Sequence, residues 1–206
     1  MRDIPIFTAA EGLATLILRE IPTRREGYVL VRSVFTNLEA LLRECEGFCR
    51  AAGAERVYFG GNADFSGYPV YARLIEREID CARLPKTTAT ACAIAEDERA
   101  RWAELYRERF LSVPAAQSAP KPEHAYWLCR DGVCIGLGQI VGEELRAVAS
   151  LSKGSGADCV AALAAATNAA RLRLLCAEEN LPAMRLYDRL GFTRGREREV
   201  WHRRAE

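Results

Sequence analysis

The stretch NLPAMRLYDRLGF, residues 180–192, combines an asparagine, a proline-opened apolar segment and a Gly-Phe pair. Proline suits the first turn of a helix, and glycine suits the left-handed residue that follows the last turn. We therefore predict a helix over Pro182–Leu190 that ends at Gly191. Within this stretch, Tyr187 is either a core residue or a group that faces a ligand, and Asn180 is either a helix cap or a ligand contact.

The preceding segment, VASLSKGSGAD at residues 148–158, runs from a strand through a glycine-rich turn into a helix. Glycines let a ligand approach the backbone closely, and the first N–H groups of a helix have no partner within it. Together with the charge of Lys153, these groups favour a phosphate. The alternative is an ordinary flexible turn in which Ser155 or Asp158 only caps the helix.

The segments around these two stretches alternate between strand and helix patterns. From residue 85 we predict the order β-α-β-β-β-α-β-α-β. The connection from the strand at 144–150 to the strand at 171–177 is long enough to join parallel neighbours. The other elements expected here are a strand at 87–95, a helix at 96–111, a hairpin at 125–140 around Asp131-Gly132, a helix at 157–168 and a strand or hairpin at 192–203. The helix at 96–111 carries an aromatic stripe that is expected in the core, with a substrate-facing role as the alternative: Trp102, Leu105, Tyr106 and Phe110.

The first part of the chain has a similar series of elements. We expect strands at 27–33 and 55–60, a helix at 37–52 between them, and a second helix over Pro69–Ile79. This series matches the one at 144–190, with Leu74 in the place of Tyr187, and it lacks the glycines. We interpret residues 1–84 as a degenerate half-repeat and residues 85–206 as the main domain; the alternative is a coincidence of common elements.

Composition limits the function classes. Lys and Arg number 29 and Asp and Glu 28, so a net charge of +1 gives no general reason to bind nucleic acid or an anionic membrane. The chain has no apolar run of about 20 residues, so no membrane span is expected. The arginines of the tail TRGREREVWHRR, residues 193–204, are interpreted as a charged sheet edge, with nucleic-acid binding as the alternative.

Eight cysteines are scattered through apolar runs. Free, buried thiols in a reducing cytoplasm are the simplest interpretation. Cys129 and Cys134 flank a turn, and no second pair of ligands lies near them in the sequence, so we expect no metal. A homodimer is left open.

The order and spacing of the glycine-rich turn, helix, strand, Asn180, Tyr187 and Gly191-Phe192 resemble the GNAT superfamily of acyl-CoA-dependent N-acyltransferases. The resemblance covers residue 85 to the end of the chain. It implies an α/β (α+β) fold with a mixed, mostly antiparallel sheet whose fourth and fifth strands splay apart, flanked by helices. It also implies that the pantetheine arm of acetyl-CoA enters the gap between those strands.

By this resemblance, the cofactor contacts fall on Val148 and Ser150 in the fourth strand and on Lys153, Gly154, Ser155, Gly156, Ala157 and Asp158 in the turn, with Asn180 beside the pantetheine. Tyr187 is implied as the catalytic acid that protonates the leaving thiolate, a role that suits a phenol with a pKa of about 10. Two positions depart from the family pattern. Lys153 replaces an Arg or Gln, and Asp158 replaces a Gly or Ala and brings a carboxylate near the diphosphate.

The expected function is N-acetyltransfer from acetyl-CoA to a primary amine of a small molecule or peptide; the alternative is an acyl-CoA-binding regulatory module without turnover. The acceptor cannot be identified from the sequence. Four glutamates at strand ends are candidates for a general base, although surface glutamates are common at such places: Glu143, Glu144, Glu178 and Glu179.

Overall fold

The computed structural model describes residues 1–116 and 123–204. They form two compact units, one made of residues 1–73 with the chain from Arg198 onward and the other of residues 74–197. This division lies earlier than the expected boundary after residue 84, because strand β5 (Val70–Asp80) begins in the first unit and ends in the second. Strand β11 (Thr193–His202) begins in the second unit and ends in the first.

The strands follow one hydrogen-bonded order, β1-β2-β3-β4-β11-β5-β10-β9-β8-β7-β6. Two neighbouring pairs are parallel, β3–β4 and β9–β10. The other pairs whose register the structure gives are antiparallel. The expected mixed, mostly antiparallel sheet is therefore confirmed.

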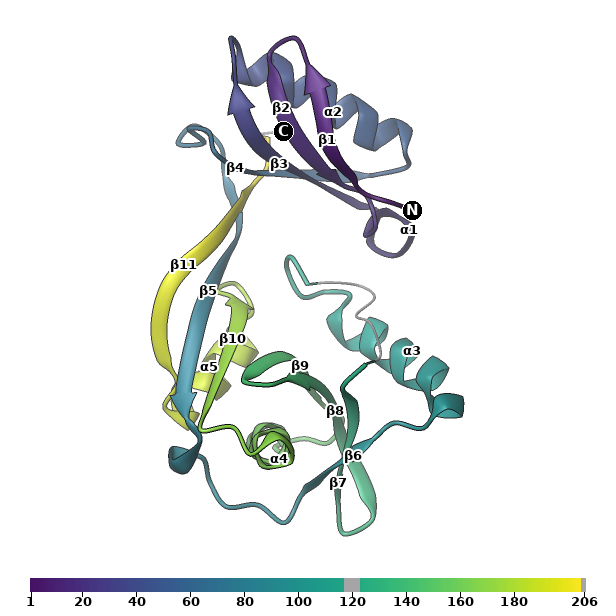
Figure 1. Ribbon diagram of the computed structural model, residues 1–206, viewed down its shortest axis with the longest axis vertical. Coiled ribbons are helices and arrows are strands. Elements are labelled where there is room, and N and C mark those ends of the chain that lie inside the picture. The colour runs from purple at the N-terminus through teal and green to yellow at the C-terminus, as the bar shows by residue number, and fades with distance from the viewer. Residues whose placement is uncertain (117–122, 205–206) are drawn as a thin grey trace. The chain divides into compact units, whose positions relative to one another are not determined.

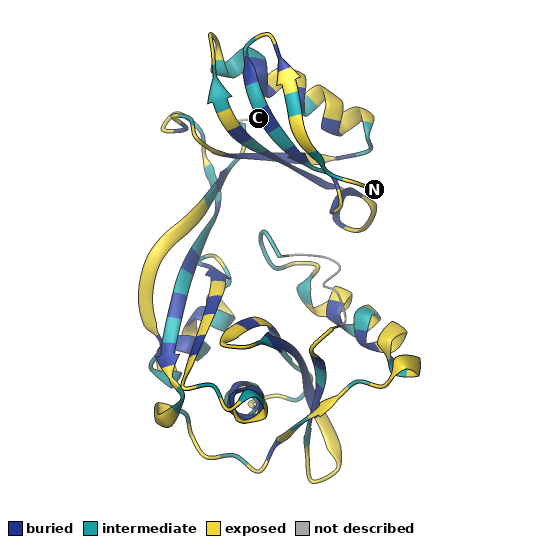
Figure 2. Ribbon diagram, viewed as in Figure 1, coloured by how far each residue is buried: buried dark blue, intermediate teal, exposed yellow. Residues whose placement is uncertain are grey.

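In the first unit, one long helix covers a face of the sheet (Figure 1). The elements are β1 (Ile4–Ala9), β2 (Gly12–Ile17), α1 (Ile21–Arg24), β3 (Glu26–Val34), α2 (Leu38–Ala51) and β4 (Arg56–Gly61). Asn37 caps α2 by accepting a bond from Ala40 N. Buried side chains of α2 pack on the strands, and its outer face is exposed (Figure 2). The helix and strands expected between residues 27 and 60 are confirmed, whereas β1 and β2 were not predicted.

The helix expected over Pro69–Ile79 is wrong, because this segment is strand β5. Its buried residues alternate along the chain, with Ile75, Arg77 and Ile79 on one face. This alternation of buried residues is a stronger signal for a strand than Pro69 is for a helix, because proline is also tolerated immediately before a strand. The half-repeat therefore fails at the element that should correspond to the helix carrying Tyr187.

The second unit follows the predicted order of elements. They are β6 (Thr90–Ala93), α3 (Arg99–Phe110), β7 (Ala125–Arg130), β8 (Val133–Val141), β9 (Glu144–Ser150), α4 (Gly156–Thr167), β10 (Arg171–Ala177) and α5 (Leu181–Leu190). Helix α4 lies very close to β8, because a Cβ added at Gly136 or Gly138 would meet Cys159 Sγ or Leu163 Cδ1 at 2.5 Å. Gly191 ends α5 with φ of 85°, as predicted.

The terminal strand differs from its predicted role. We expected a charged edge, but β11 lies between β4 and β5 in the strand order. Its charged side chains are exposed on the strand and form ion pairs with neighbours, such as Arg194 with Glu178 at 2.7 Å. Strand identity was therefore predicted correctly, and its position in the sheet was not.

Two structural findings concern membranes and metals. Among the described residues, no helix is both long and apolar enough to cross a membrane. Within 1–116 and 123–204, no three His, Cys, Asp or Glu side chains are grouped so that they could hold a metal ion. Cys129 and Cys134 are cross-strand partners in the β7–β8 hairpin, and both are free thiols.

Candidate functional site

The parallel strands β9 and β10 touch only at one end. Arg173 pairs with Glu144, Arg173 N donates to Glu143 O at 2.8 Å, and the structure gives no further register pair between the two strands. Each strand is paired along its other side, β9 with β8 and β10 with β5 over residues 171–177. Two inner strand edges therefore face a gap with backbone groups available for hydrogen bonds.

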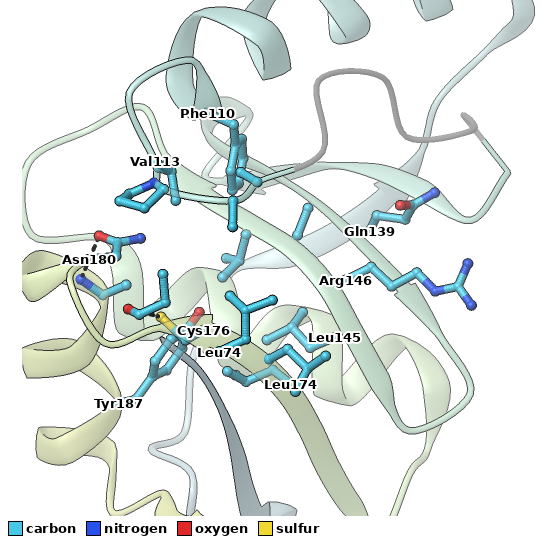
Figure 3. Close-up of a pocket in the computed structure, with 18 of the residues that line it drawn as sticks. Leu74, Phe110, Val113, Gln139, Leu145, Arg146, Leu174, Cys176, Asn180 and Tyr187 are labelled. Carbon is cyan, nitrogen blue, oxygen red and sulfur yellow. Dashed lines mark hydrogen bonds between the residues drawn. The ribbon is translucent and has the colours of Figure 1, made fainter. Parts of the chain in front are cut away.

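A pocket of about 430 Å³ occupies this gap (Figure 3). Leu145 and Val148 line it from β9, and Leu174 and Cys176 line it from β10. Further lining residues are Leu74 of β5, Tyr106 and Phe110 of α3, Val113–Ala116, Gln139, Glu144, Asn180 and Tyr187. The aromatic stripe of α3 therefore lies in two environments. Trp102 is fully buried in the core, whereas Tyr106 and Phe110 line the pocket.

Tyr187 lies where α5 meets the pocket. The residue is 6% exposed, and its ring packs against Phe192 with centroids 5.1 Å apart. Figure 3 shows the ring beside Cys176 and Leu74. Burial raises the pKa of Tyr187 far above its usual value, and the Cys176 thiol adds to this effect, while the cation of Arg77 opposes it. The phenol is therefore protonated at neutral pH and can act as a proton donor.

The loop after β9 is fixed by a serine network. Ser155 is 2% exposed, and its hydroxyl lies 2.8 Å from Ser150 Oγ and donates to Ile135 O at 3.1 Å. Ser155 N donates to Ser152 O. The hydroxyl groups of Ser150 and Ser155 therefore fix the conformation of the loop. These contacts do not point either hydroxyl group toward a ligand.

The first turn of α4 offers the groups that the sequence predicts for an anion. Gly156, Ala157 and Asp158 begin the helix, and no described residue accepts a hydrogen bond from their N–H groups. Gly154 has φ of 84° and open space around the position of a Cβ. Lys153 is exposed on the same turn. Partial positive charge at the helix start and the ammonium group together make this turn suitable for a phosphate.

Asp158 brings a carboxylate to this turn, and two neighbouring side chains bind that carboxylate. Its carboxylate forms an ion pair with Arg130 Nη1 at 2.8 Å and accepts a bond from Thr87 Oγ1 at 2.8 Å. The ion pair with the guanidinium offsets part of the negative charge that this carboxylate brings to the turn. This arrangement accounts for an acidic residue in the first turn.

Asn180 serves as the N-cap of α5, since its Oδ1 accepts a bond from Ala183 N at 3.5 Å. Figure 3 shows the amide nitrogen on the side away from this cap bond. Asn180 also lines the pocket, so its role as a helix cap leaves the predicted ligand contact open. The structure thus brings Val148, Asn180 and Tyr187 to one pocket. It places residues 153–155 on the adjoining loop and 156–158 in the first turn of α4, outside the lining.

Sequence reasoning missed several residues of the site. Cys176 lies in the pocket beside Tyr187, and burial raises the pKa of its thiol to about 11. Arg130 of β7 contacts Asp158, and Arg77 of β5 contacts Asp188, the residue after Tyr187; no local motif indicates either contact. Of the four candidate bases, Glu144 lines the pocket, where it is exposed and paired with Arg146 at 3.1 Å. Glu178 instead pairs with Arg194.

Comparison with known proteins gives structural likeness at low sequence identity. No family model and no curated protein matches the sequence. A conserved protein of unknown function from Staphylococcus epidermidis has a TM-score of 0.61 and 10% identity, over 97% of this chain and 94% of that one. A GCN5-related N-acetyltransferase from Kribbella flavida has a TM-score of 0.56 and 15% identity, over 98% and 90%.

A third neighbour, a GCN5-related N-acetyltransferase from Sphaerobacter thermophilus, has a TM-score of 0.52 and 16% identity, over 94% of this chain and 76% of that one. These matches span nearly the whole chain, so they give no support to a separate N-terminal half-repeat. The chain therefore has the fold of the GCN5-related N-acetyltransferases, the GNAT fold.

Proposed function

We propose that this protein transfers the acetyl group of acetyl-CoA directly to a primary amine of a small molecule or peptide. The observation that carries the proposal is the open pair β9–β10, which leaves a pocket beside a buried, protonated tyrosine. The free thiols suit a reducing cytoplasm as the place of action.

The inner edge of β9 suits the pantetheine arm. The amide groups of the pantetheine arm have the donors and acceptors of a peptide. They can therefore hydrogen-bond to the backbone from Val148 to Ser150 in the manner of an added strand. The diphosphate would then lie at the N–H groups of Gly156, Ala157 and Asp158, with Lys153 adding its charge. The residues present therefore fit coenzyme A at both ends of the gap.

Tyr187 supplies the proton that the reaction needs. The amine nitrogen attacks the thioester carbonyl carbon, a C–N bond forms and the C–S bond breaks. Tyr187 gives its phenolic proton to the departing thiolate, and water carries the extra proton from the amine nitrogen back to the Tyr187 oxygen, which restores the phenol. Burial keeps the phenol protonated at neutral pH, so Tyr187 holds the proton to be given and cannot serve as a base, while the raised pKa makes it a weaker acid than a free tyrosine.

The test is release of CoA from acetyl-CoA in the presence of a panel of amines. Tyr187→Phe should lower kcat by about 100-fold and leave KM for acetyl-CoA within about twofold, because the proton is needed only as the thiolate leaves. Tyr126→Phe is the matched control, since this tyrosine of β7 does not line the pocket. Acetyl-CoA binding without turnover, unchanged in Tyr187→Phe, would contradict the proposal and favour the regulatory module.

A further inference from the structure

A buried arginine from β5 is fixed against the helix that carries Tyr187. The side chain of Arg77 is 5% exposed, and its Nη2 contacts Asp188 Oδ1 at 2.8 Å and Met184 Sδ at 3.7 Å. Its Nη1 donates to Phe192 O at 3.3 Å. These partners lie in α5 and immediately after it, so the guanidinium runs along the segment in which Tyr187 sits.

The guanidinium charge is only partly balanced. Asp188 is its carboxylate partner, and the Asp188 side chain is 62% exposed, so water screens that ion pair. Arg77 Nε is buried and has no hydrogen-bond partner among the described residues. A buried cation in such a position needs a physical reason, because an unmatched donor lowers stability.

The proposed reaction supplies such a reason. When the C–S bond breaks, negative charge forms on sulfur and passes to the Tyr187 oxygen as the proton moves, in surroundings that disfavour it. Besides burial, the Cys176 thiol of β10 raises the pKa of Tyr187, and the Arg77 guanidinium of β5 lowers it. Arg77 reaches this part of α5 through Asp188, which directly follows Tyr187. Burial also raises the pKa of the Cys176 thiol. Arg77 lowers this pKa, and Glu179 raises it.

We propose that Arg77 is a positioning residue that holds α5 in place and stabilises the negative charge arising between the sulfur of coenzyme A and Tyr187. This inference rests on the proposed function. It goes beyond that function by giving the strand β5 a part in the chemistry. Arg77 acts through Tyr187 and does not line the pocket, so its loss should change the ionisation of the bound thiol more than the affinity for the cofactor.

The experiment is a pH titration of the thiol of CoA bound to the full chain, followed by the ultraviolet absorbance of the thiolate. Complexes with desulfo-CoA, which lacks the thiol, serve as the blank and cancel the protein cysteines. Arg77→Met should raise the midpoint by about one pH unit relative to wild type, because a nearby cation favours the thiolate. Arg77→Lys, which keeps the charge, should stay closer to wild type.

Arg77→Gln is a second uncharged variant for the case that Arg77→Met does not fold, and circular dichroism checks both. Equal midpoints in wild type and a folded uncharged variant, with CoA bound in each, would overturn the role of Arg77 and leave the proposed function standing. Failure of the wild-type chain to bind CoA would instead overturn the proposed function and this inference with it.

Discussion

The molecule contains two parallel strand pairs with the same connection, β3–α2–β4 and β9–α4–β10, and only the second opens. In the first pair, the register runs without a break from Glu26↔Arg56 to Val31↔Gly61. In the second pair, the register given is the single match Arg173↔Glu144. The same strand–helix–strand unit therefore gives a closed sheet in one unit and a pocket in the other.

The residues at the strand ends explain part of this difference. Where β4 ends, Gly60 and Gly61 lack side chains, and a Cβ on Gly61 would meet Val31 O at 2.3 Å. Where β10 ends, Cys176 and Ala177 carry side chains, and both line the pocket. Strand β10 is also paired with β5 along its full length. Glycines thus permit the close approach in the first pair, and side chains with a competing partner accompany the separation in the second.

The largest expected effect comes from filling the open pair. Val148→Trp should lower CoA affinity by more than about 100-fold, because the indole would occupy the space proposed for the pantetheine arm. The measurement is calorimetric titration. The matched control is Leu30→Trp on β3, in the closed pair, which should bind CoA as the wild type does. Unchanged affinity in folded Val148→Trp would place the ligand elsewhere.

The next effect concerns the closed pair. Gly61→Ala should lower the free energy of unfolding by about 2–3 kcal/mol, because the residue has φ of 101° and its Cβ would clash with the backbone of β3. Gly154→Ala also has a positive φ but open space, so it should lose only about 1 kcal/mol. Denaturant unfolding measures both. Equal losses would show that close approach is unimportant at Gly61.

A smaller effect is expected on the loop beside the open pair. Lys153→Ala should weaken CoA binding by about fivefold to tenfold at low salt, and the difference should shrink as salt rises, because the charge is exposed and screened. Lys86→Ala, another exposed lysine of the second unit, is the control. Calorimetry at two salt concentrations makes the comparison, and an effect independent of salt would exclude a simple charge interaction.

The smallest effect should follow from Asp158→Asn. Because Arg130 offsets part of the charge of the carboxylate and water screens the rest, removal of the Asp158 charge should change CoA affinity by no more than about threefold, in the direction of tighter binding. A gain of more than about tenfold would mean that the carboxylate opposes the diphosphate despite its ion pair. Affinity is again measured by calorimetry.

Local patterns predicted the elements beside the open pair better than the places of strands in the sheet. The helix over Pro182–Leu190 and the strand at 171–177 follow from caps and periodicity within short stretches, and the structure confirms them. The strand identity of Val70–Asp80 was missed because proline and apolar residues suit either a helix or a strand. The positions of β5 and β11 in the sheet depend on long-range pairing, which no local signal contains.

The same limit applies to the candidate site. Tyr187 and Asn180 were predicted from a motif, and both line the pocket. The contacts around them were not predicted, because Arg77 is far from α5 in sequence and reaches it only in the folded chain, through Met184 and Asp188. The ion pair of Asp158 with Arg130 is a further example of a contact that decides the charge of a predicted residue.

Amide hydrogen exchange with and without coenzyme A tests the central claim, that the gap between β9 and β10 receives the cofactor. We predict that CoA slows exchange at Val148–Ser150 and at the first turn of α4, and leaves the β3–β4 pair unchanged. No protection at β9 at saturating CoA, or protection confined to β3–β4, would contradict the account.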